Sequence, residues 1–121
     1  MKKVYRIQKR KDFVEISRFG ACFRAESVVV QCRLNSVGSF RAGFTASKKV
    51  GNSVVRNRCK RRMRSVVDEL CKKDLLIGAD YVFIARKKTF SAQWNVLVSE
   101  CVKAVEFLNK KAASCRKSIS V

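Results

Sequence analysis

The chain has 121 residues, of which 47% are hydrophobic, and its formal net charge is +19. This apolar content is too high for a disordered basic tail, so the charge must lie on the surface of a folded domain. A folded domain that repels itself this strongly is typical of proteins that bind polyanions, and no apolar run approaches the roughly 20 residues of a membrane span.

The first half of the chain predicts a helix followed by three strands. A short helix is expected over residues 9–19, stopped by Gly20, and a short strand near residues 22–24. Residues 27–34 are β-branched and residues 39–46 alternate between apolar and polar side chains, which predicts two further strands. Because a short glycine-containing turn joins these two strands, we expect them to form an antiparallel hairpin.

The second half predicts helix, strand and helix. The first helix starts at Asn52 or Ser53 as N-cap and runs to about Cys71, and a strand follows over residues 80–86. Ser91 is expected to cap a long last helix that ends near Ala112. The expected inner faces of the two helices consist of Val55, Cys59, Met63, Val66, Val67 and Leu70, and of Trp94, Leu97, Val98, Cys101, Val105 and Leu108. The order α-β-β-β-α-β-α predicts a single α+β domain, residues 1–121, with a four-stranded sheet packed against helices.

The cysteine pattern predicts free thiols and no metal site. Several of the six cysteines lie in apolar periodic runs, where cysteine behaves as a small hydrophobe. No apolar segment follows the basic N-terminus as a signal peptide requires, so a reducing cytoplasmic location is expected. The sequence contains no histidine and no Cys-x-x-Cys pair, which excludes the usual zinc spacings.

The strongest chemical signal is the basic segment SKKVGNSVVRNRCKRRMR, residues 47–64. On a helix, Arg56, Lys60 and Arg64 are i,i+4 neighbours, and Arg58 and Arg62 form a second pair on the flank. Each like-charge pair destabilises a helix by roughly 0.2–0.5 kcal/mol, and the helix dipole also disfavours cations near the N-terminus. An external phosphate would relieve this strain, because arginine can bind it with two hydrogen bonds.

This segment closely resembles the signature of the bacterial ribonuclease P protein component, which contains Ser-Lys-Lys-x-Gly-Asn-Ala/Ser-Val-x-Arg-Asn-Arg-x-Lys-Arg. The match is long and therefore specific. The resemblance continues at Arg10, Phe13 and Gly20, and again over DYVFIARKK, residues 80–88. It covers nearly the whole chain in the right order.

The resemblance implies the protein subunit of an RNA-based endoribonuclease that removes the 5′ leader from precursor tRNA. The RNA subunit carries the active site and its Mg²⁺ ions, so no catalytic residue and no stably bound metal or cofactor is expected on this chain. The implied partners are the catalytic RNA and precursor tRNA, without a membrane or an obligate protein partner. The implied fold is similar to the second domain of ribosomal protein S5, with a left-handed β-α-β crossover through the basic helix.

The family pattern also assigns site residues by position. The matching RNA-contacting positions are Lys48, Lys49, Asn52, Arg56, Asn57, Arg58, Lys60, Arg61 and Arg64. The resemblance implies a cleft for the single-stranded leader between the sheet face and the first helix, with Lys9, Lys11, Phe13, Ser17 and Gln31 as its expected residues.

Two of these cleft positions depart from the family pattern. Ser17 stands one helical turn after Phe13, where a second aromatic residue is common, and Gln31 stands at a strand position that is often aromatic. Stacking is worth roughly 1–3 kcal/mol per base, so weaker leader binding is expected. We expect Phe19 to lie in the core, whereas Phe13 suits the core and the cleft equally.

A strongly basic chain can also belong to three other functional classes. A stand-alone nuclease requires a histidine base or a carboxylate cluster, and the close acidic pairs Asp12–Glu15 and Asp68–Glu69 are expected to form salt bridges with neighbouring arginines instead. A membrane-active peptide requires an apolar face for lipid, which this helix needs for its core. A ribosomal or other structural RNA-binding protein is the remaining alternative.

Overall fold

Five strands form one mixed sheet in the order β1-β4-β5-β3-β2. The computed structural model describes residues 5–7, 9–35 and 39–119, with side chains described for residues 6–7, 9–35 and 39–112. The strands are β1 (Tyr5–Arg6), β2 (Ala21–Arg24), β3 (Val28–Leu34), β4 (Arg41–Thr45) and β5 (Ala79–Ala85). The β2–β3 and β3–β5 pairs are antiparallel, and the β1–β4 and β4–β5 pairs are parallel.

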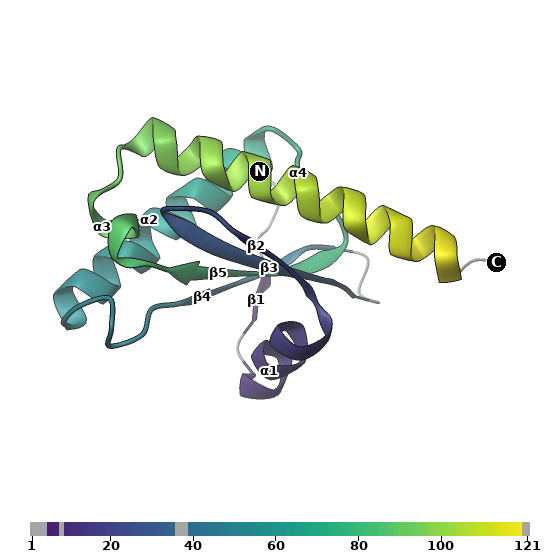
Figure 1. The fold of residues 1–121 in the computed structure, drawn as a ribbon, viewed down its shortest axis with the longest axis horizontal. Coiled ribbons are helices and arrows are strands. Elements are labelled where there is room, and N and C mark those ends of the chain that lie inside the picture. The colour runs from purple at the N-terminus through teal and green to yellow at the C-terminus, as the bar shows by residue number, and fades with distance from the viewer. Residues whose placement is uncertain (1–4, 8, 36–38, 120–121) are drawn as a thin grey trace.

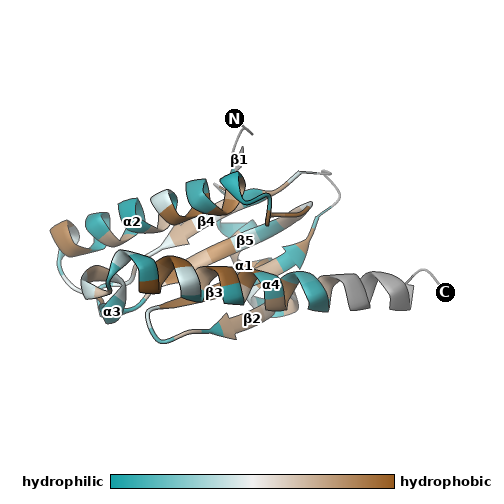
Figure 2. Ribbon diagram, turned by 90° about the horizontal axis from the view of Figure 1, so that it is seen from above, coloured by the Kyte–Doolittle hydropathy of each residue, from teal (hydrophilic) through white to brown (hydrophobic). Residues whose placement is uncertain are grey.

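Helices cover both faces of this sheet (Figure 1). On one face lie α2 (Ser53–Lys72) and α4 (Trp94–Ile119), and on the other lies α1 (Arg10–Phe19), while the short α3 (Lys87–Ser91) connects β5 to α4. The main core fills the space between the sheet and the α2–α4 layer, and a smaller cluster of Ile7, Ile16 and Val82 lies under α1. Hydrophilic and hydrophobic residues alternate around α2 and α4, as expected of helices with one buried face (Figure 2).

The predicted helices and strands are largely confirmed. Asn52 is the N-cap of α2, since its Oδ1 accepts a 3.0 Å hydrogen bond from the backbone N–H of Val55. The stripe predicted for this helix is buried from Cys59 to Leu70, with Val55 packed at its margin. The parallel neighbours β4 and β5 are joined through α2, so the crossover that the resemblance implies is present, and its left-handedness stays a prediction.

The predicted hairpin between residues 27–34 and 39–46 is wrong. β5 lies between these two strands, pairing antiparallel with β3 and parallel with β4. All but one of the side chains of β5 are buried, which is typical of a central strand covered on both faces. β3 forms its hairpin with β2 instead, and β1 adds a fifth, two-residue strand that the sequence did not indicate.

Three further details at the helices differ from the expectation. Ser91 ends α3 and does not cap α4, which begins at Trp94 and extends to Ile119. Trp94 is 43% exposed, because at the first residue of the helix it lies beside α2 rather than over the sheet. Phe19, expected in the core, is 68% exposed and lies beneath the guanidinium of Arg33, whose carbon is 5.3 Å from the ring centre.

Candidate nucleic-acid interface

The loop before α2 brings backbone and basic side chains close to the start of the helix. A turn over residues 47–50 presents the exposed Lys48 and Lys49. At the next residue, Gly51 has a φ of +156°, and a Cβ there would lie 2.9 Å from the Val55 side chain. Only glycine allows this close approach, so the sequence fixes the two lysines next to the helix N-terminus.

The basic side chains of α2 lie outside its buried stripe. Arg56, Lys60 and Arg64 follow one another at i,i+4 spacing, and the Arg64 guanidinium carbon lies 5.9 Å from the centre of the Phe44 ring of β4. Arg61 is exposed on the outer side of the helix, together with Asn57. The RNA-contacting positions that the sequence predicts on α2 therefore line its accessible surface.

These cations have no carboxylate partner in the part of the chain that the structure describes. Among the residues that the structure describes, no ion pair involves a basic side chain of residues 48–64. The Nε atom of Arg56 is buried and has no hydrogen-bond partner in that same part of the chain. The first turn of α2 contains no acidic residue that would offset the positive end of the helix dipole. This surface is therefore suited to an external anion.

Arg62 has a different role from the other arginines of α2. Its Nη1 donates hydrogen bonds of 2.7 Å and 2.8 Å to the carbonyls of Thr89 and Phe90, and its Nη2 donates to the carbonyl of Ala92. These bonds satisfy carbonyls at the end of α3 and fasten this helix to α2. The sequence pairs Arg58 with Arg62, but the structure separates them, since Arg58 is exposed and its guanidinium carbon lies 5.3 Å from the centre of the Phe90 ring.

A second region of interest is the sheet face beside α1. The half-buried Phe13 packs against the small cluster under α1, and a Cβ at Gly43 would lie 2.6 Å from Phe13 Cε1. The absence of a side chain at Gly43 lets the ring lie directly on the sheet. Phe13 therefore fits both the core and the cleft that the sequence allows for it. One side of its ring packs in the core, and another part of the residue is accessible.

The strand register places the other predicted cleft residues relative to Phe13. Gly43 pairs with Val82 and Val82 with Gln31, so these three residues form a row across one face of the sheet. Gln31 is half-exposed, and Ser17 is exposed one helical turn after Phe13 on the same flank of α1. Lys9 and Lys11 line a groove with Arg6, Asp12, Glu15 and Arg41, and Phe13 is not part of that lining, although its N–H donates to the carbonyl of Lys9.

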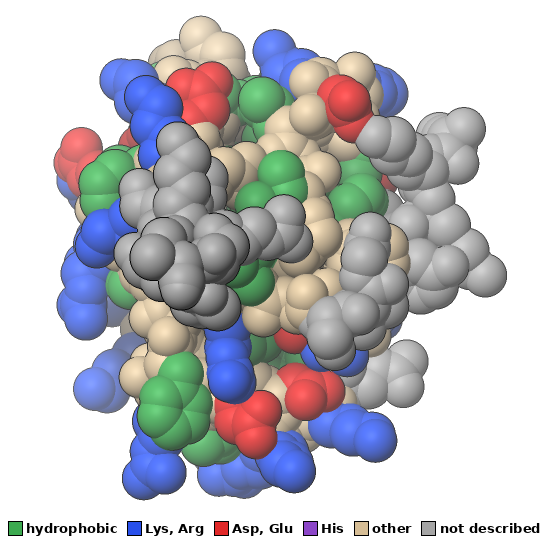
Figure 3. Space-filling view, turned by 90° about the vertical axis from the view of Figure 1, so that its right-hand side faces the viewer, with side chains coloured by type: hydrophobic (Ala, Val, Ile, Leu, Met, Phe, Trp, Pro, Cys, Tyr) green, Lys and Arg blue, Asp and Glu red, His purple; other side chains and the backbone are tan. Residues whose placement is uncertain are grey.

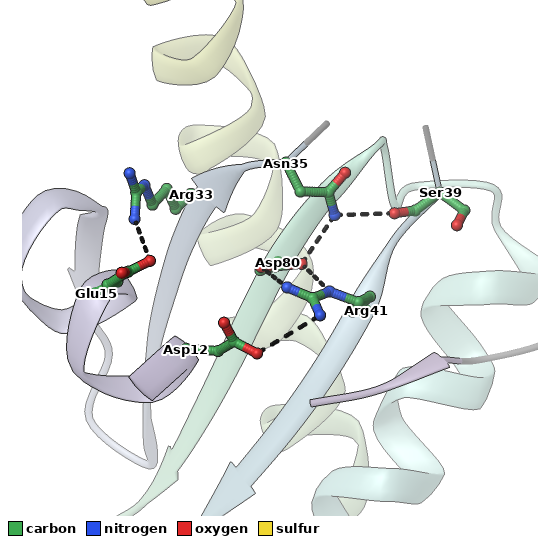
Figure 4. Close-up of polar contacts among 7 residues, drawn as sticks. All are labelled: Asp12, Glu15, Arg33, Asn35, Ser39, Arg41 and Asp80. Atoms are coloured by element: carbon green, nitrogen blue, oxygen red, sulfur yellow. Dashed lines mark hydrogen bonds and ion pairs between the residues drawn. The ribbon is translucent and has the colours of Figure 1, made fainter. Parts of the chain in front are cut away.

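A network of ion pairs fixes α1 on the sheet (Figure 4). The guanidinium of Arg41 donates from Nε and Nη2 to the two carboxylate oxygens of the buried Asp80, at 2.7 Å and 2.6 Å, and Nη1 lies 3.7 Å from Asp12. Asn35 donates a further 2.8 Å bond to Asp80, and Glu15 pairs with Arg33 at 3.3 Å. The hydrogen bond to Asp80 raises the pKa of Arg41.

These contacts explain the acidic pairs of the sequence. The expectation that Asp12 and Glu15 pair with arginines is confirmed, whereas Glu69 pairs with Lys72, at 3.4 Å. Acidic and basic side chains are intermixed at the end of the molecule where α1 lies (Figure 3). No group of three or more potential metal ligands occurs among the described residues.

The described cysteines contribute to packing. Cys32, Cys59 and Cys101 are buried, and burial raises the pKa of the Cys32 and Cys101 thiols to about 12. Cys22, Cys32, Cys59 and Cys101 are free thiols, and Cys115 lies outside the residues whose side chains are described. Within the same residues, none of the helices combines the length and apolar character needed to cross a bilayer.

Sequence reasoning missed the surroundings of Arg58. Phe90 and Trp94, both exposed, line a groove of about 450 Å³ together with Arg58 and Arg61. The available signal was an aromatic residue two positions after the basic run of residues 86–88, followed by a tryptophan four residues later. This signal was missed because Trp94 was expected on the inner face of α4.

Comparisons with known proteins agree on one family. The family model described as Ribonuclease P matches residues 1–109. The ribonuclease P protein component of Paramagnetospirillum magneticum is 36% identical over 106 residues, which cover 84% of this chain and 80% of that protein. The one from Streptococcus pneumoniae is 41% identical over 87 residues, which cover 72% of this chain and 70% of that protein.

Solved structures show the same similarity. A structure of the Staphylococcus aureus RNase P protein superposes with a TM-score of 0.70 at 31% identity, covering 91% of this chain and 96% of that one. The RNase P protein from Thermotoga maritima superposes with a TM-score of 0.71 at 26% identity, covering 87% of this chain and 96% of that one. The α+β architecture described above is therefore shared with these proteins.

Proposed function

The chain belongs to the ribonuclease P protein family, and on this premise we propose that it is the protein subunit of the ribonucleoprotein that removes the 5′ leader from precursor tRNA. In this role the RNA subunit carries the active site and the Mg²⁺ ions. The protein supplies binding surfaces and no catalytic residue. It acts in the cytoplasm and needs no second protein.

The observation that carries the proposal is the basic surface of α2 without internal carboxylate partners. Its exposed arginines bear the family motif and have no ion pair among the described residues. Arginine binds phosphate with paired hydrogen bonds, so this surface suits the backbone of the catalytic RNA. If six to eight cations each contact a phosphate, the logarithm of the binding constant should fall with the logarithm of salt concentration with a slope of roughly −4 to −7.

The sheet face beside α1 is the proposed contact for the leader. Phe13 is partly accessible there, and Ser17 and Gln31 lie on the same side of α1 and the sheet. Unpaired bases bind proteins by stacking on such rings. Because Lys9 and Lys11 line a groove at the start of α1, just before Phe13, we propose that they contact phosphates of the leader next to the base at Phe13.

Reconstitution tests the proposal. The full chain is mixed with a bacterial ribonuclease P RNA, and leader removal from a precursor tRNA is measured at low Mg²⁺. We expect strong stimulation over RNA alone, and no cleavage by the protein alone. Absence of stimulation, together with unimpaired binding to other structured RNAs, would favour the alternative of a structural RNA-binding protein.

Two variants separate the proposed surfaces. Arg61→Ala removes one exposed cation, so it should weaken binding to the catalytic RNA by about tenfold and make the salt slope about one unit less negative. Phe13→Leu keeps apolar packing under α1 but removes the ring, so it should weaken binding of precursor tRNA and leave binding of mature tRNA unchanged. Lys110→Ala, an exposed cation of α4, is the matched control and should change neither.

A further inference from the structure

The groove between α2 and α3 combines charge and aromatic surface in a way that the packing of the protein does not require. Its lining consists of Arg58, Arg61, Arg62, Ser65, Phe90, Ser91, Ala92 and Trp94. Its volume is about 450 Å³. No carboxylate of the described residues lines it, so the charge of its lining is wholly positive.

Both aromatic side chains of the groove expose much of their surface. Phe90 is 38% and Trp94 is 43% exposed, whereas Tyr81 and Phe83 in the core are fully buried. Arg58 lies over the Phe90 ring, with its guanidinium carbon 5.3 Å from the ring centre. No ring, cation or hydrogen-bond partner from the described residues is found at Trp94. Its indole therefore offers a free surface beside a guanidinium.

The floor of the groove is held in place by Arg62. Its hydrogen bonds to the carbonyls of Thr89, Phe90 and Ala92 fix the end of α3 and hence the position of the Phe90 ring. The guanidinium of Arg62 is occupied by these bonds. Arg58 and Arg61 remain for an external ligand, and they are the two cations on the side of the groove that opens to solvent.

We propose that this groove binds one unpaired nucleotide of RNA, with its phosphate on Arg58 and Arg61 and its base stacked on Trp94. The proposal rests on the proposed function, since the ligand is RNA, and it adds a base-reading site to a surface otherwise suited to backbone contacts. A bulged or looped nucleotide fits this chemistry, because a base within a duplex cannot reach the aromatic rings. An acidic peptide would satisfy the arginines but would leave the aromatic surface without a stacking partner.

Tryptophan fluorescence reports directly on this site, since Trp94 is the only tryptophan of the chain. The full chain is titrated with a fluorescein-labelled single strand of eight adenosines and, separately, with a blunt RNA duplex. Anisotropy of the label measures binding anywhere on the protein, and emission of Trp94 measures occupation of the groove. We expect the single strand to quench the emission in a saturable manner and the duplex to bind with little quenching.

Substitutions that keep Trp94 test the lining. Arg58→Ala removes a phosphate contact, and Phe90→Leu removes the ring that supports Arg58, so each should move the midpoint of quenching to about tenfold higher RNA concentration. Phe107→Leu is a matched control, because Phe107 is 42% exposed and also lies beside a cation, Lys111, but outside the groove. It should leave the midpoint unchanged.

The outcomes separate this proposal from the proposed function. RNA binding by anisotropy with unchanged Trp94 emission would overturn the nucleotide site and leave the proposed function intact. Quenching by polyglutamate but not by RNA would overturn it in favour of a peptide site. If the chain neither binds RNA nor stimulates the catalytic RNA, both proposals fail together.

Discussion

Arginines in two regions of the molecule differ in what their guanidinium groups contact. At the junction of α1 with the sheet, Arg41 and Arg33 are paired with carboxylates, and the buried Asp80 receives two hydrogen bonds from Arg41. On α2, Arg58, Arg61 and Arg64 have no carboxylate partner among the described residues. The first region uses its charge to hold the fold, and the second leaves its charge for a ligand.

This difference shows that net charge alone does not locate an interface. Arg62 lies within the most basic run of the sequence, yet its bonds to the carbonyls of Thr89, Phe90 and Ala92 make it a structural residue. A structural arginine is distinguished from a ligand-binding one by what its guanidinium contacts, and not by its position in the basic run. Substitutions in the two regions should therefore change different measured quantities.

Arg41→Ala should have the largest effect, on stability. It leaves the carboxylate of Asp80, which is only 6% exposed, with the amide of Asn35 as its remaining hydrogen-bond donor among the described residues. Removing one partner of a buried ion pair typically costs about 3–5 kcal/mol, and we expect about 3 kcal/mol because Arg41 is partly exposed. Urea unfolding measures this loss. Lys48→Ala, on the exposed loop, should change stability by less than roughly 0.5 kcal/mol, and a similar value for both variants would contradict the comparison.

Arg62→Ala should have the next largest effect, and it separates neighbouring residues of one helix. It removes charge-assisted hydrogen bonds to carbonyls at the end of α3, at a cost of about 2 kcal/mol in the free energy of unfolding. Arg61→Ala, one residue earlier and exposed, should leave unfolding unchanged and weaken RNA binding. Equal losses of RNA affinity and of stability in the two variants would contradict the distinction between a structural Arg62 and an RNA-binding Arg61.

The elements of the fold could be predicted because their apolar periods are clear, but the strand order could not. The alternating pattern of residues 39–46 fits a strand paired antiparallel in a hairpin as well as a strand paired in parallel with one that follows later in the chain. What decides is the burial of β5 on both faces, which places it between β3 and β4. That decision depends on contacts far apart in sequence, beyond the reach of a local pattern. The two-residue β1 is too short to leave any periodic signal.

The α2 site could be predicted in outline, because helical spacing and the family motif agree on its exposed cations. Spacing could not show that Arg62 turns to carbonyls of α3, since α3 was not predicted. Phe19 and Trp94 were misplaced for a related reason. An aromatic side chain at the end of a helix can belong to the apolar stripe by its angle and still project past the elements that would cover it.

Ser17→Phe tests whether the region beside α1 binds bases rather than phosphates. The new ring would lie one helical turn from Phe13 on an exposed position, where it could stack on a second base of the leader. We expect binding of precursor tRNA to strengthen by about 1 kcal/mol, the lower end of the stacking range, with no change for mature tRNA. The gain should not alter the salt slope. A steeper salt slope would instead assign the effect to phosphate contacts.

The smallest effect concerns two lysines of α2. The same substitution at each should change the free energy of unfolding in opposite directions. Lys60 is the i,i+4 neighbour of Arg56 and Arg64, whereas Lys72, in the last turn, pairs with Glu69 at 3.4 Å. Each like-charge pair costs roughly 0.2–0.5 kcal/mol, and a cation in the last turn interacts favourably with the helix dipole. At low salt, Lys60→Gln should therefore raise the free energy of unfolding by about 0.5 kcal/mol, and Lys72→Gln should lower it by a similar amount. Only Lys60→Gln should weaken RNA binding. In the free protein the Lys60 ammonium group repels its arginine neighbours, and in the complex a bound phosphate neutralises the same group. Stabilisation by Lys60→Gln without loss of RNA affinity would mean that this row of cations faces no phosphate.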